Sequence, residues 1–560
     1  SIFLHQSKII LKKFFYIIKP LMLKNLNIWV LSSLIISIGV LIPITTVFFS
    51  FFEETSNYYQ ILKDTFLFEY IFNSFVLLVC VLVLTFIIGT TCAYLVSFYK
   101  FPFSDFFKWA LILSFAVPPY IYAYSLTAFF ENYGTAFTIL TNLFGEGEYN
   151  KNIPKFDGLL GAVLSLSFSL YAYVYILSRA SFLYQSQNLI DLGRSLGFSK
   201  IKSLFYLIIP AARPAIVAGL SLVAMETLAE FGAVDFFSIN TLTTGIYNSW
   251  ITFDDLAFSN RLSFFLLIFI FTCFVIENFS RKKARYHFNS KGGFKQKEKI
   301  VLTGKHSFFA FIFCFVIFFL SFLFPLSQML YWTIKFPENL YDIDLISLTL
   351  NTIYLVVLSS LVLIIFSLIS NYGNRVSNNK FLNFLSTISI SGYAIPGVIL
   401  AVAFITFVAW FDNNIIKTLG FFSIKKVFIG SVLGLVLVYF VRFYSLAFNG
   451  IKSGYEKINI SVDESSYLLG YSKKKTFLNI HMPLLRNSLL FVAILISIEI
   501  VRELPITLIL RPFNFETFAT TAYISASEDL LEAAAVPSLF LILIATIFIM
   551  FTSKYILREK

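Results

Sequence analysis

Charged residues are scarce in this sequence. Asp, Glu, Lys and Arg make up 13% of the 560 residues, hydrophobic residues make up 58%, and the mean hydropathy is +0.81. A soluble domain carries about 25% charged residues. Since only lipid can solvate so much apolar surface, the composition excludes a soluble globular protein. It predicts an all-α polytopic membrane protein.

Cysteine and histidine are also few and scattered. No cysteine pair has CxxC spacing and the histidines lie far apart, at Cys80, Cys92, Cys273, Cys314, His5, His287, His306 and His481. This pattern excludes the common zinc spacings and a disulfide framework, and we assign no metal site. The sequence has no G-x-x-x-x-G-K-[ST] motif that would cradle ATP. We therefore expect a protein that is not an enzyme and has no cofactor of its own.

Long apolar runs are abundant. A helix needs about 20 apolar residues to cross a bilayer, and about twelve runs of that length occur, six on each side of a polar linker. They centre on 28–51, 71–98, 106–130, 158–183, 213–236, 261–279, 307–333, 348–371, 381–411, 427–449, 486–510 and 533–554.

Basic residues orient these predicted spans. The linker 281–306 is the most basic segment, and residues 1–27 before the first span are basic too. The positive-inside bias places both segments in the cytoplasm. It also accounts for the net charge of +12 without a nucleic-acid partner. Counting spans then puts both chain termini and the loops 184–212 and 450–485 on the cytoplasmic side.

The two sides of the linker are copies of each other. Asn73 and Asn351 open the second span of each copy, 278 residues apart. The same offset relates AVPP from Ala116 to AIPG from Ala394, and later positions follow an offset of 273. The sequence therefore predicts two parallel six-helix halves, residues 1–280 and 307–560, because each half has an even number of spans.

The two cytoplasmic loops share one pattern. Gly197 and Pro210 are thirteen residues apart, as are Gly470 and Pro483 in the second copy. The glycine permits a left-handed turn between two short helices, and the proline ends the second helix or begins the next span. Acidic residues suit the first turn of the first short helix, and these are Asp191 and Glu464.

This pattern resembles the EAA coupling loop of type I ABC importer permeases, in which E-A-A, three residues, G, nine residues and I-x-L-P recur. The first copy reads Asp191-Leu192-Gly193, Gly197 and Leu207-Ile208-Ile209-Pro210, and the second reads Glu464-Ser465-Ser466, Gly470 and Ile480-His481-Met482-Pro483. Neither copy keeps the two alanines, and the first has Asp for Glu. The resemblance implies that each loop docks on one subunit of a separate ATPase homodimer, which binds the ATP.

Two further stretches are similar to the fused permeases of bacterial ferric-iron importers. They are METLAEFGAVDFFSINTLTTGIYNSW from Met225 and FKWALILSFAVPPYIYAYS from Phe107. This likeness implies a multi-pass protein of the bacterial inner membrane that receives Fe(III) from a periplasmic ferric-iron-binding protein. Permeases for thiamine, phosphonates and sulfate share the architecture and stay open as alternatives.

Four glutamates lie within predicted spans. Glu226 and Glu230 share one helix face, and Glu499 and Glu503 repeat the arrangement. Carboxylates inside a span often mark a substrate path, and their oxygens suit a hard cation such as Fe(III). One hypothesis is that all four flank the translocation pathway. The alternative is that they pair with arginines, Arg179, Arg442 or Arg502, or bond to backbone.

Other features give weaker expectations. Pro118, Pro119 and Pro396 predict a kink in the third span of each half, and Asp235 is expected at the outer mouth, where a binding protein would dock. A secondary transporter driven by an ion gradient is the rival class. It would not need two matched cytoplasmic loops, and many such transporters have inverted repeats.

Overall fold

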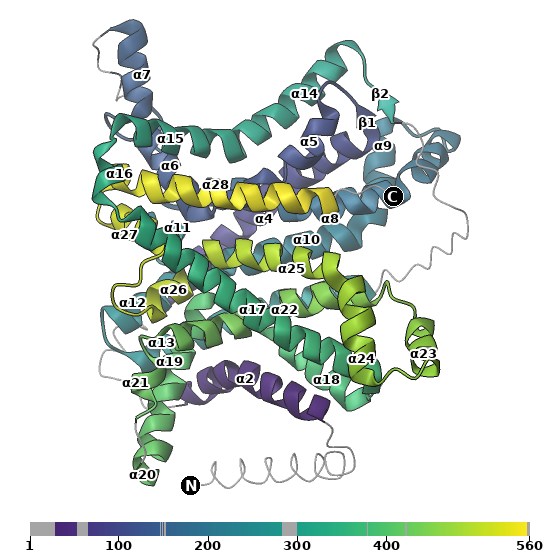
Figure 1. Cartoon of the computed structure of the whole chain (residues 1–560). Helices are drawn as coiled ribbons and strands as arrows, with labels where there is room; N and C mark the ends of the chain where they lie inside the picture. Colours follow the sequence, from purple (N-terminus) through teal and green to yellow (C-terminus); the bar gives the residue numbers. More distant parts are fainter. Residues whose placement is uncertain are drawn as a thin grey trace.

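The structure is a computed structural model in which long helices run side by side along one direction (Figure 1). It describes residues 28–52, 65–145, 147, 149, 153–282, 299–377, 379–420 and 423–556. The basic segment 1–27 and residues 283–298 of the predicted linker lie outside the described residues, so the orientation drawn from their charge stays a prediction.

The long helices agree with the predicted spans. Eleven described helices are long and apolar enough to cross a membrane, or up to twelve if one bent pair counts as a span. In the first half they are α2 (Ile28–Ser50), α4 (Leu67–Phe98), the pair α5 (Ser104–Ala110) and α6 (Pro119–Phe130), α8 (Gly158–Ser195), α10 (Ile209–Ala229) and α13 (Leu256–Lys282). In the second half they are α14 (Gly304–Phe318) with α15 (Phe324–Lys335), α17 (Leu345–Ser377), α19 (Gly397–Phe411), α22 (Val432–Tyr455), α25 (Met482–Arg502) and α28 (Leu531–Ile556), and the shorter α18 (Lys380–Ser389) precedes α19.

Short elements join these helices. The short helices are α7 (Thr135–Phe144), α9 (Lys200–Ser203), α11 (Gly232–Phe236), α12 (Leu242–Ile251), α16 (Glu338–Asp342), α20 (Lys417–Leu419), α21 (Lys425–Phe428), α23 (Ile460–Leu468), α24 (Lys473–Thr476), α26 (Pro505–Leu510) and α27 (Phe518–Ser527). Single 3-10 turns are η1 (Leu113–Ala116) and η5 (Ile390–Ala394), and π-helical turns are η3 (Leu204–Ile208), η4 (Phe319–Leu323), η6 (Asp412–Ile416) and η7 (Phe477–His481).

Each half is built on a three-helix core. Helices α4, α8 and α10 pack together in the first half, and α17, α22 and α25 do so in the second. Glycines permit the close approach in the first core, because a Cβ at Gly89 of α4 or at Gly219 of α10 would come within 2.8 Å of Val174 in α8. The matching cores are what two parallel six-helix repeats require.

The first helix of each half packs on the other half. Helix α2 lies against α17, α18 and α19, while α14 contacts α5 and α15 contacts α6. Hydrogen bonds cross these contacts, from Ser37 Oγ to the Leu385 carbonyl at 2.9 Å and from Gln328 Nε2 to Thr135 Oγ1 at 2.9 Å. The two halves are therefore interlocked.

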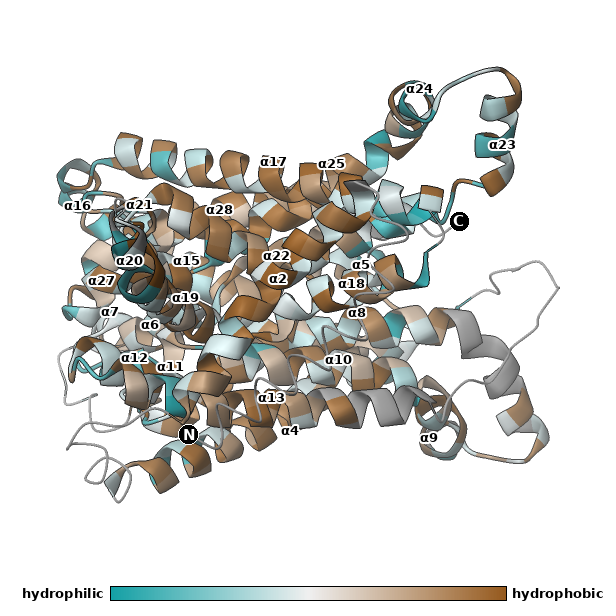
Figure 2. Cartoon of the chain, turned by 90° about the horizontal axis from the view of Figure 1, so that it is seen from below, coloured by the Kyte–Doolittle hydropathy of each residue, from teal (hydrophilic) through white to brown (hydrophobic). Residues whose placement is uncertain are grey.

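Short elements gather at the two ends of the helices. In both views α9, α23 and α24 lie at one end, and α7, α12, α16, α20, α21 and α27 lie at the other (Figures 1 and 2). At the same end as α9 in Figure 1, the strands β1 (Tyr99–Lys100) and β2 (Ile300–Val301) form a two-residue parallel pair. Beside it Lys299 Nζ donates to the Val96 carbonyl at 2.7 Å, which fixes the chain just before α14 to the first half.

Candidate functional site: a carboxylate-lined cavity between the halves

A cavity of about 70 Å³ lies between the two halves at the ends of α10 and α25. All four glutamates singled out in the sequence contribute to its lining. The residues around it are Pro118, Pro119, Tyr120, Leu170, Tyr173, Glu226, Ala229, Glu230, Phe231, Gly232, Arg442, Glu499, Arg502, Glu503, Leu504 and Pro505. Four carboxylates and two guanidiniums leave a formal charge of −2 on this lining, which favours a cation over an anion.

Glu230 and Glu503 occupy matching positions where a long helix ends. Each is the residue that follows its helix, α10 or α25, and each has an extended backbone conformation. Glu230 Oε1 accepts a hydrogen bond from the Ala233 N–H at 2.9 Å, and Glu503 Oε1 accepts one from the Ile506 N–H at 3.3 Å. The carboxylates thus satisfy free N–H groups of the short helices α11 and α26.

Arginines bind the two carboxylates of the second half. Arg502 Nη2 donates to Glu499 Oε1 at 2.7 Å, and Arg442 Nε lies 3.3 Å from Glu503 Oε2. Glu226 is bound by a tyrosine instead, because the Tyr393 hydroxyl donates a hydrogen bond to Glu226 Oε1 at 3.0 Å.

The third span of each half breaks beside the cavity. In the first half the chain turns by 90° between α5–η1 and α6–α7, and Pro119 begins α6. In the second half η5 leads to Pro396, which precedes α19. The kinks predicted at these prolines are present, and the cavity lies where the two broken spans meet α10 and α25.

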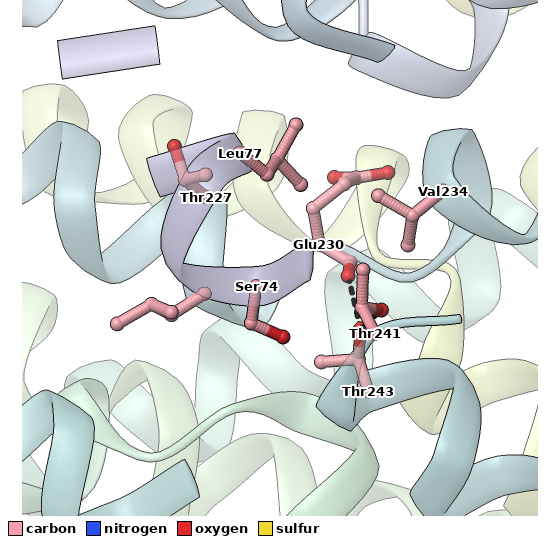
Figure 3. A pocket seen from close by; sticks show the side chains of 8 residues that line it. Ser74, Leu77, Thr227, Glu230, Val234, Thr241 and Thr243 are labelled. Carbon is pink, nitrogen blue, oxygen red and sulfur yellow. Dashed lines mark hydrogen bonds between the residues drawn. The ribbon is translucent and has the colours of Figure 1, made fainter. Parts of the chain in front are cut away.

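A second, smaller cavity adjoins Glu230. It has a volume of about 10 Å³, enough for one water molecule, and is lined by Ser74, Leu77, Thr227, Leu228, Glu230, Val234, Thr241 and Thr243. Figure 3 shows Glu230 among these side chains, and Thr243 Oγ1 donates to its main-chain oxygen at 2.8 Å. The Thr227 hydroxyl is buried and has no hydrogen-bond partner among the described residues.

The loops 184–212 and 450–485 contain the predicted left-handed glycines. Gly197 has φ +70° and Gly470 has φ +79°. In each loop the next N–H reaches back five residues, from Phe198 to the Gly193 carbonyl at 2.8 Å and from Tyr471 to the Ser466 carbonyl at 3.1 Å. This is the Schellman arrangement that ends a helix at a glycine, and the two copies repeat it.

Comparison with known proteins decides the family. Residues 85–282 match the family described as "binding-protein-dependent transport system inner membrane component". The chain is also 23% identical over 494 residues to "Fe(3+)-transport system permease protein FbpB 2" of Haemophilus influenzae, covering 87% of this chain and 90% of that protein. The chain is a binding-protein-dependent transport permease. It is therefore a multi-pass inner-membrane transport subunit with the type I permease fold.

In this permease the loop prolines begin membrane helices. Pro210 and Pro483 lie in the first turn of α10 and α25, and a π-helical turn precedes each of these helices. Because proline lacks an N–H and crowds the preceding turn, a wider turn before it lets the helix continue without a break. The second short helix of each loop therefore runs directly into a span.

The expected place of Asp191 is wrong, while an acidic residue does lie in the first turn beside Glu464. Asp191 lies near the end of α8, a continuous helix of 38 residues, and not in the first turn of a short helix. Glu464 lies one residue beyond the first turn of α23, whose acidic residue is Asp463. The error at Asp191 has a physical cause: an apolar run does not reveal whether its helix stops at the membrane surface or continues past it. Docking on an ATPase stays a prediction for both loops.

Asp463, which the sequence pattern did not single out, fixes α23 to the membrane helices of the permease. Its buried carboxylate accepts a hydrogen bond from Arg375 Nε at 2.6 Å and lies 2.6 Å from His481 Nε2. Burial raises the pKa of Asp463, but hydrogen bonds from Arg375 and His481 outweigh it and hold this pKa below its usual range. Arg375 also donates to the Tyr455 and Ile458 carbonyls. No spacing rule relates these distant residues.

Asp235 lies at the end of the permease opposite α9 and α23, as expected, but it is only partly accessible. The Tyr523 hydroxyl of α27 donates to Asp235 Oδ2 at 2.5 Å. This bond joins α11 of the first half to α27 of the second. Binding-protein docking at Asp235 stays a prediction, and the contact between the halves is the role that the geometry shows.

Among the described residues, no group of three or more His, Cys, Asp or Glu side chains is arranged to hold a metal ion. The four glutamates are spread around a cavity and do not converge on one point. Their place at the meeting of the two halves fits both hypotheses made from the sequence, and a role in translocation stays a prediction. Arg442 and Arg502 are their arginine partners, while Arg179 is not part of the lining.

Proposed function

We propose that this permease is the membrane subunit of an ABC importer that moves Fe(III) into the cytoplasm. The observation that carries the proposal is the central cavity, in which carboxylates from both halves outnumber guanidiniums. Carboxylate oxygens are preferred ligands of hard cations. The similar FbpB 2 is named as an Fe(3+)-transport permease, which supports the same substrate.

In this proposal the chain supplies the path and the transmission of movement, while ATP is bound and hydrolysed by a partner. A periplasmic ferric-iron-binding protein docks at the end that carries α11, α12 and α27. An ATPase homodimer binds the loops 184–212 and 450–485 at the opposite end, which is cytoplasmic in this proposal. Closure of the ATPase dimer draws the two loops together, and the halves rock so that the cavity opens to one side at a time.

The matched loops favour this mechanism over an ion-driven secondary transporter. Gly197 and Gly470 form the same left-handed turn, and Pro210 and Pro483 begin the same helix in the two halves. Two equivalent loops at one end suit a partner with two equivalent docking sites. The coupling contacts are then expected around these four residues and around Asp191 and Glu464.

The test is ATP hydrolysis by the permease reconstituted in liposomes with its candidate ATPase. The binding protein is added in turn loaded with Fe(III), thiamine or a phosphonate, and also without cargo. We expect stimulation by the iron-loaded form alone. Stimulation by another cargo would keep the importer and overturn iron as the substrate, and a permease that binds no ATPase would overturn the importer itself.

A further inference from the structure

The two walls of the central cavity carry matching glutamates, but only one wall carries arginines. Glu226 matches Glu499, and Glu230 matches Glu503, at an offset of 273 residues. At that offset Arg502 is replaced by Ala229 in the first half, and Arg442 is replaced by Ser169. Both guanidiniums in the cavity therefore come from the second half. A fused chain permits this asymmetry, since its halves can differ in sequence.

Both arginines are held in place by backbone as well as by carboxylates. Arg502 Nη1 donates to the Phe115 carbonyl at 2.7 Å, and Arg442 Nη1 donates to the Ile395 carbonyl at 3.1 Å. These carbonyls belong to the breaks of the two third spans, where helical hydrogen bonds are lost. Each arginine thus joins a broken span to a second-half glutamate, which is the arrangement of a structural ion pair.

The first-half glutamates have no such partner. In the described part of the chain, no Lys or Arg nitrogen lies within 4.0 Å of Glu226 or Glu230. Arg442 and Arg502 are near enough to act on Glu226 electrostatically, but their ion-pair contacts are with Glu503 and Glu499. Glu226 is bound by the Tyr393 phenol and Glu230 by one backbone N–H.

A second observation places a ligand position beside Glu230. This residue lines both the central cavity and the cavity of about 10 Å³. The Thr227 hydroxyl in the small cavity is 3% exposed and has no hydrogen-bond partner among the described residues. A buried hydroxyl without a partner loses free energy unless a water molecule or a ligand binds it. In the second half the matching position is Ile500, which offers no such group.

We infer that the cation is contacted by one wall of the cavity only, through the carboxylates of Glu226 and Glu230. Glu499 and Glu503 hold Arg502 and Arg442 and keep the broken third spans in place. The ligand class for the first-half wall is a hard, oxygen-preferring cation that has shed part of its water shell. This inference rests on the proposed function for the identity of the cation as Fe(III).

The test uses the reconstituted complex with its ATPase and iron-loaded binding protein. Iron uptake, ATP hydrolysis and the thermal midpoint are measured for Glu226→Gln, Glu230→Gln, Glu499→Gln and Glu503→Gln. We expect the first two to keep the wild-type midpoint while iron taken up per ATP hydrolysed falls about tenfold, as for the loss of one charge-assisted contact. Glu226→Asp should restore part of the uptake.

The second-half variants test the structural role. Glu499→Gln and Glu503→Gln each leave a buried guanidinium without its counter-ion, so we expect a lower thermal midpoint. The double variants E499Q/R502Q and E503Q/R442Q remove both charges and keep a side-chain amide that can donate to the carbonyl. They should recover the midpoint and keep the wild-type ratio of iron to ATP.

Two results separate this inference from the proposed function. If the wild-type complex takes up no iron, the proposed function is overturned, and with it the assignment of Fe(III) as the substrate. If wild-type complex takes up iron but Glu226→Gln and Glu230→Gln take up as much, the inference alone is overturned. It is also overturned if a stable double variant loses as much uptake as Glu226→Gln, because the second wall would then contact the cation.

Discussion

A single carboxylate attaches the loop 450–485 to the membrane helices. Asp463 accepts from Arg375 on α17 and contacts His481 in the turn before α25, so it joins α23 to two spans at once. The first half has no equivalent, because the residues at the matching positions are Ser97, Ile190 and Ile208. The three residues of this contact are thus not repeated in the first half.

Replacing Asp463 with Asn should destabilise the protein by about 1.5–3 kcal/mol at neutral pH, since the partly buried Arg375 would lose a hydrogen bond to a charged group. Thermal unfolding in detergent measures this. The depressed pKa of Asp463 means that its stabilisation is present above the unfolded-state pKa near 4 and disappears as the pH falls through the folded-state value. The difference between variant and wild type should therefore shrink in acid.

The neighbouring Glu464 offers a matched control. Its side chain is exposed, on the same helix and of the same charge, so Glu464→Gln should leave the thermal midpoint within about 0.5 kcal/mol of wild type. Equal midpoints for Asp463→Asn and Glu464→Gln would show that the Asp463 contacts contribute no stability.

At the scale of elements, the turn before α24 needs a glycine because of its left-handed backbone conformation and not because space is short. Gly470 has φ +79°, yet a Cβ built there would have no neighbour within 4 Å. Gly197 before α9 is the same in both respects. A side chain at either position would fit in space but not in conformation.

Gly470→Ala should therefore cost about 1–2 kcal/mol, the penalty of the left-handed conformation for a residue with a β-carbon. Thermal unfolding and the ATPase rate in the reconstituted complex measure the effect. Gly470→Asn adds a larger side chain but tolerates this conformation better, so it should be the milder variant. A larger loss for Asn than for Ala would indicate that the loop surface needs the space instead.

Element by element, the sequence predicts some features and misses others for physical reasons. Apolar length locates the spans because the bilayer has a fixed thickness, and a repeated glycine reports a backbone conformation directly. By contrast, no local pattern shows that α8 continues past Asp191, or that a π-helical turn precedes Pro210. The contacts of Asp463 with Arg375 and His481 join residues up to 88 positions apart, and only the folded chain brings them together.

At the scale of the whole molecule, the repeat gives the halves one architecture and different chemistry. Thr241 and Thr517 form the same capping box at the start of α12 and α27, so backbone geometry follows the symmetry. The side chains that bridge the halves do not follow this symmetry. The repeat therefore predicts where the central cavity lies, but the partners of its carboxylates had to come from the structure.

One asymmetric contact holds the halves together at the end away from the loops 184–212 and 450–485. Tyr523 donates to Asp235, and the Phe231 ring lies against Tyr523 and Tyr247 with centroids 5.7 and 4.6 Å apart. In the proposed topology this end is periplasmic and must open before iron enters. The contact exists only while α11 and α27 are together, so it favours the state that is closed to the periplasm.

Tyr523→Phe removes this hydrogen bond and keeps the ring. A hydrogen bond to a charged group contributes about 1.5–3 kcal/mol, so its loss should shift the resting equilibrium towards the state that is open to the periplasm by about tenfold or more. ATP hydrolysis without binding protein should then rise, because that state brings the loops and the ATPase subunits together.

Tyr247 is the repeat counterpart of Tyr523, and its hydroxyl makes no hydrogen bond to another described residue. Tyr247→Phe should therefore leave basal hydrolysis unchanged. Equal basal rates for wild type and both variants would show that the Asp235–Tyr523 bond does not control opening.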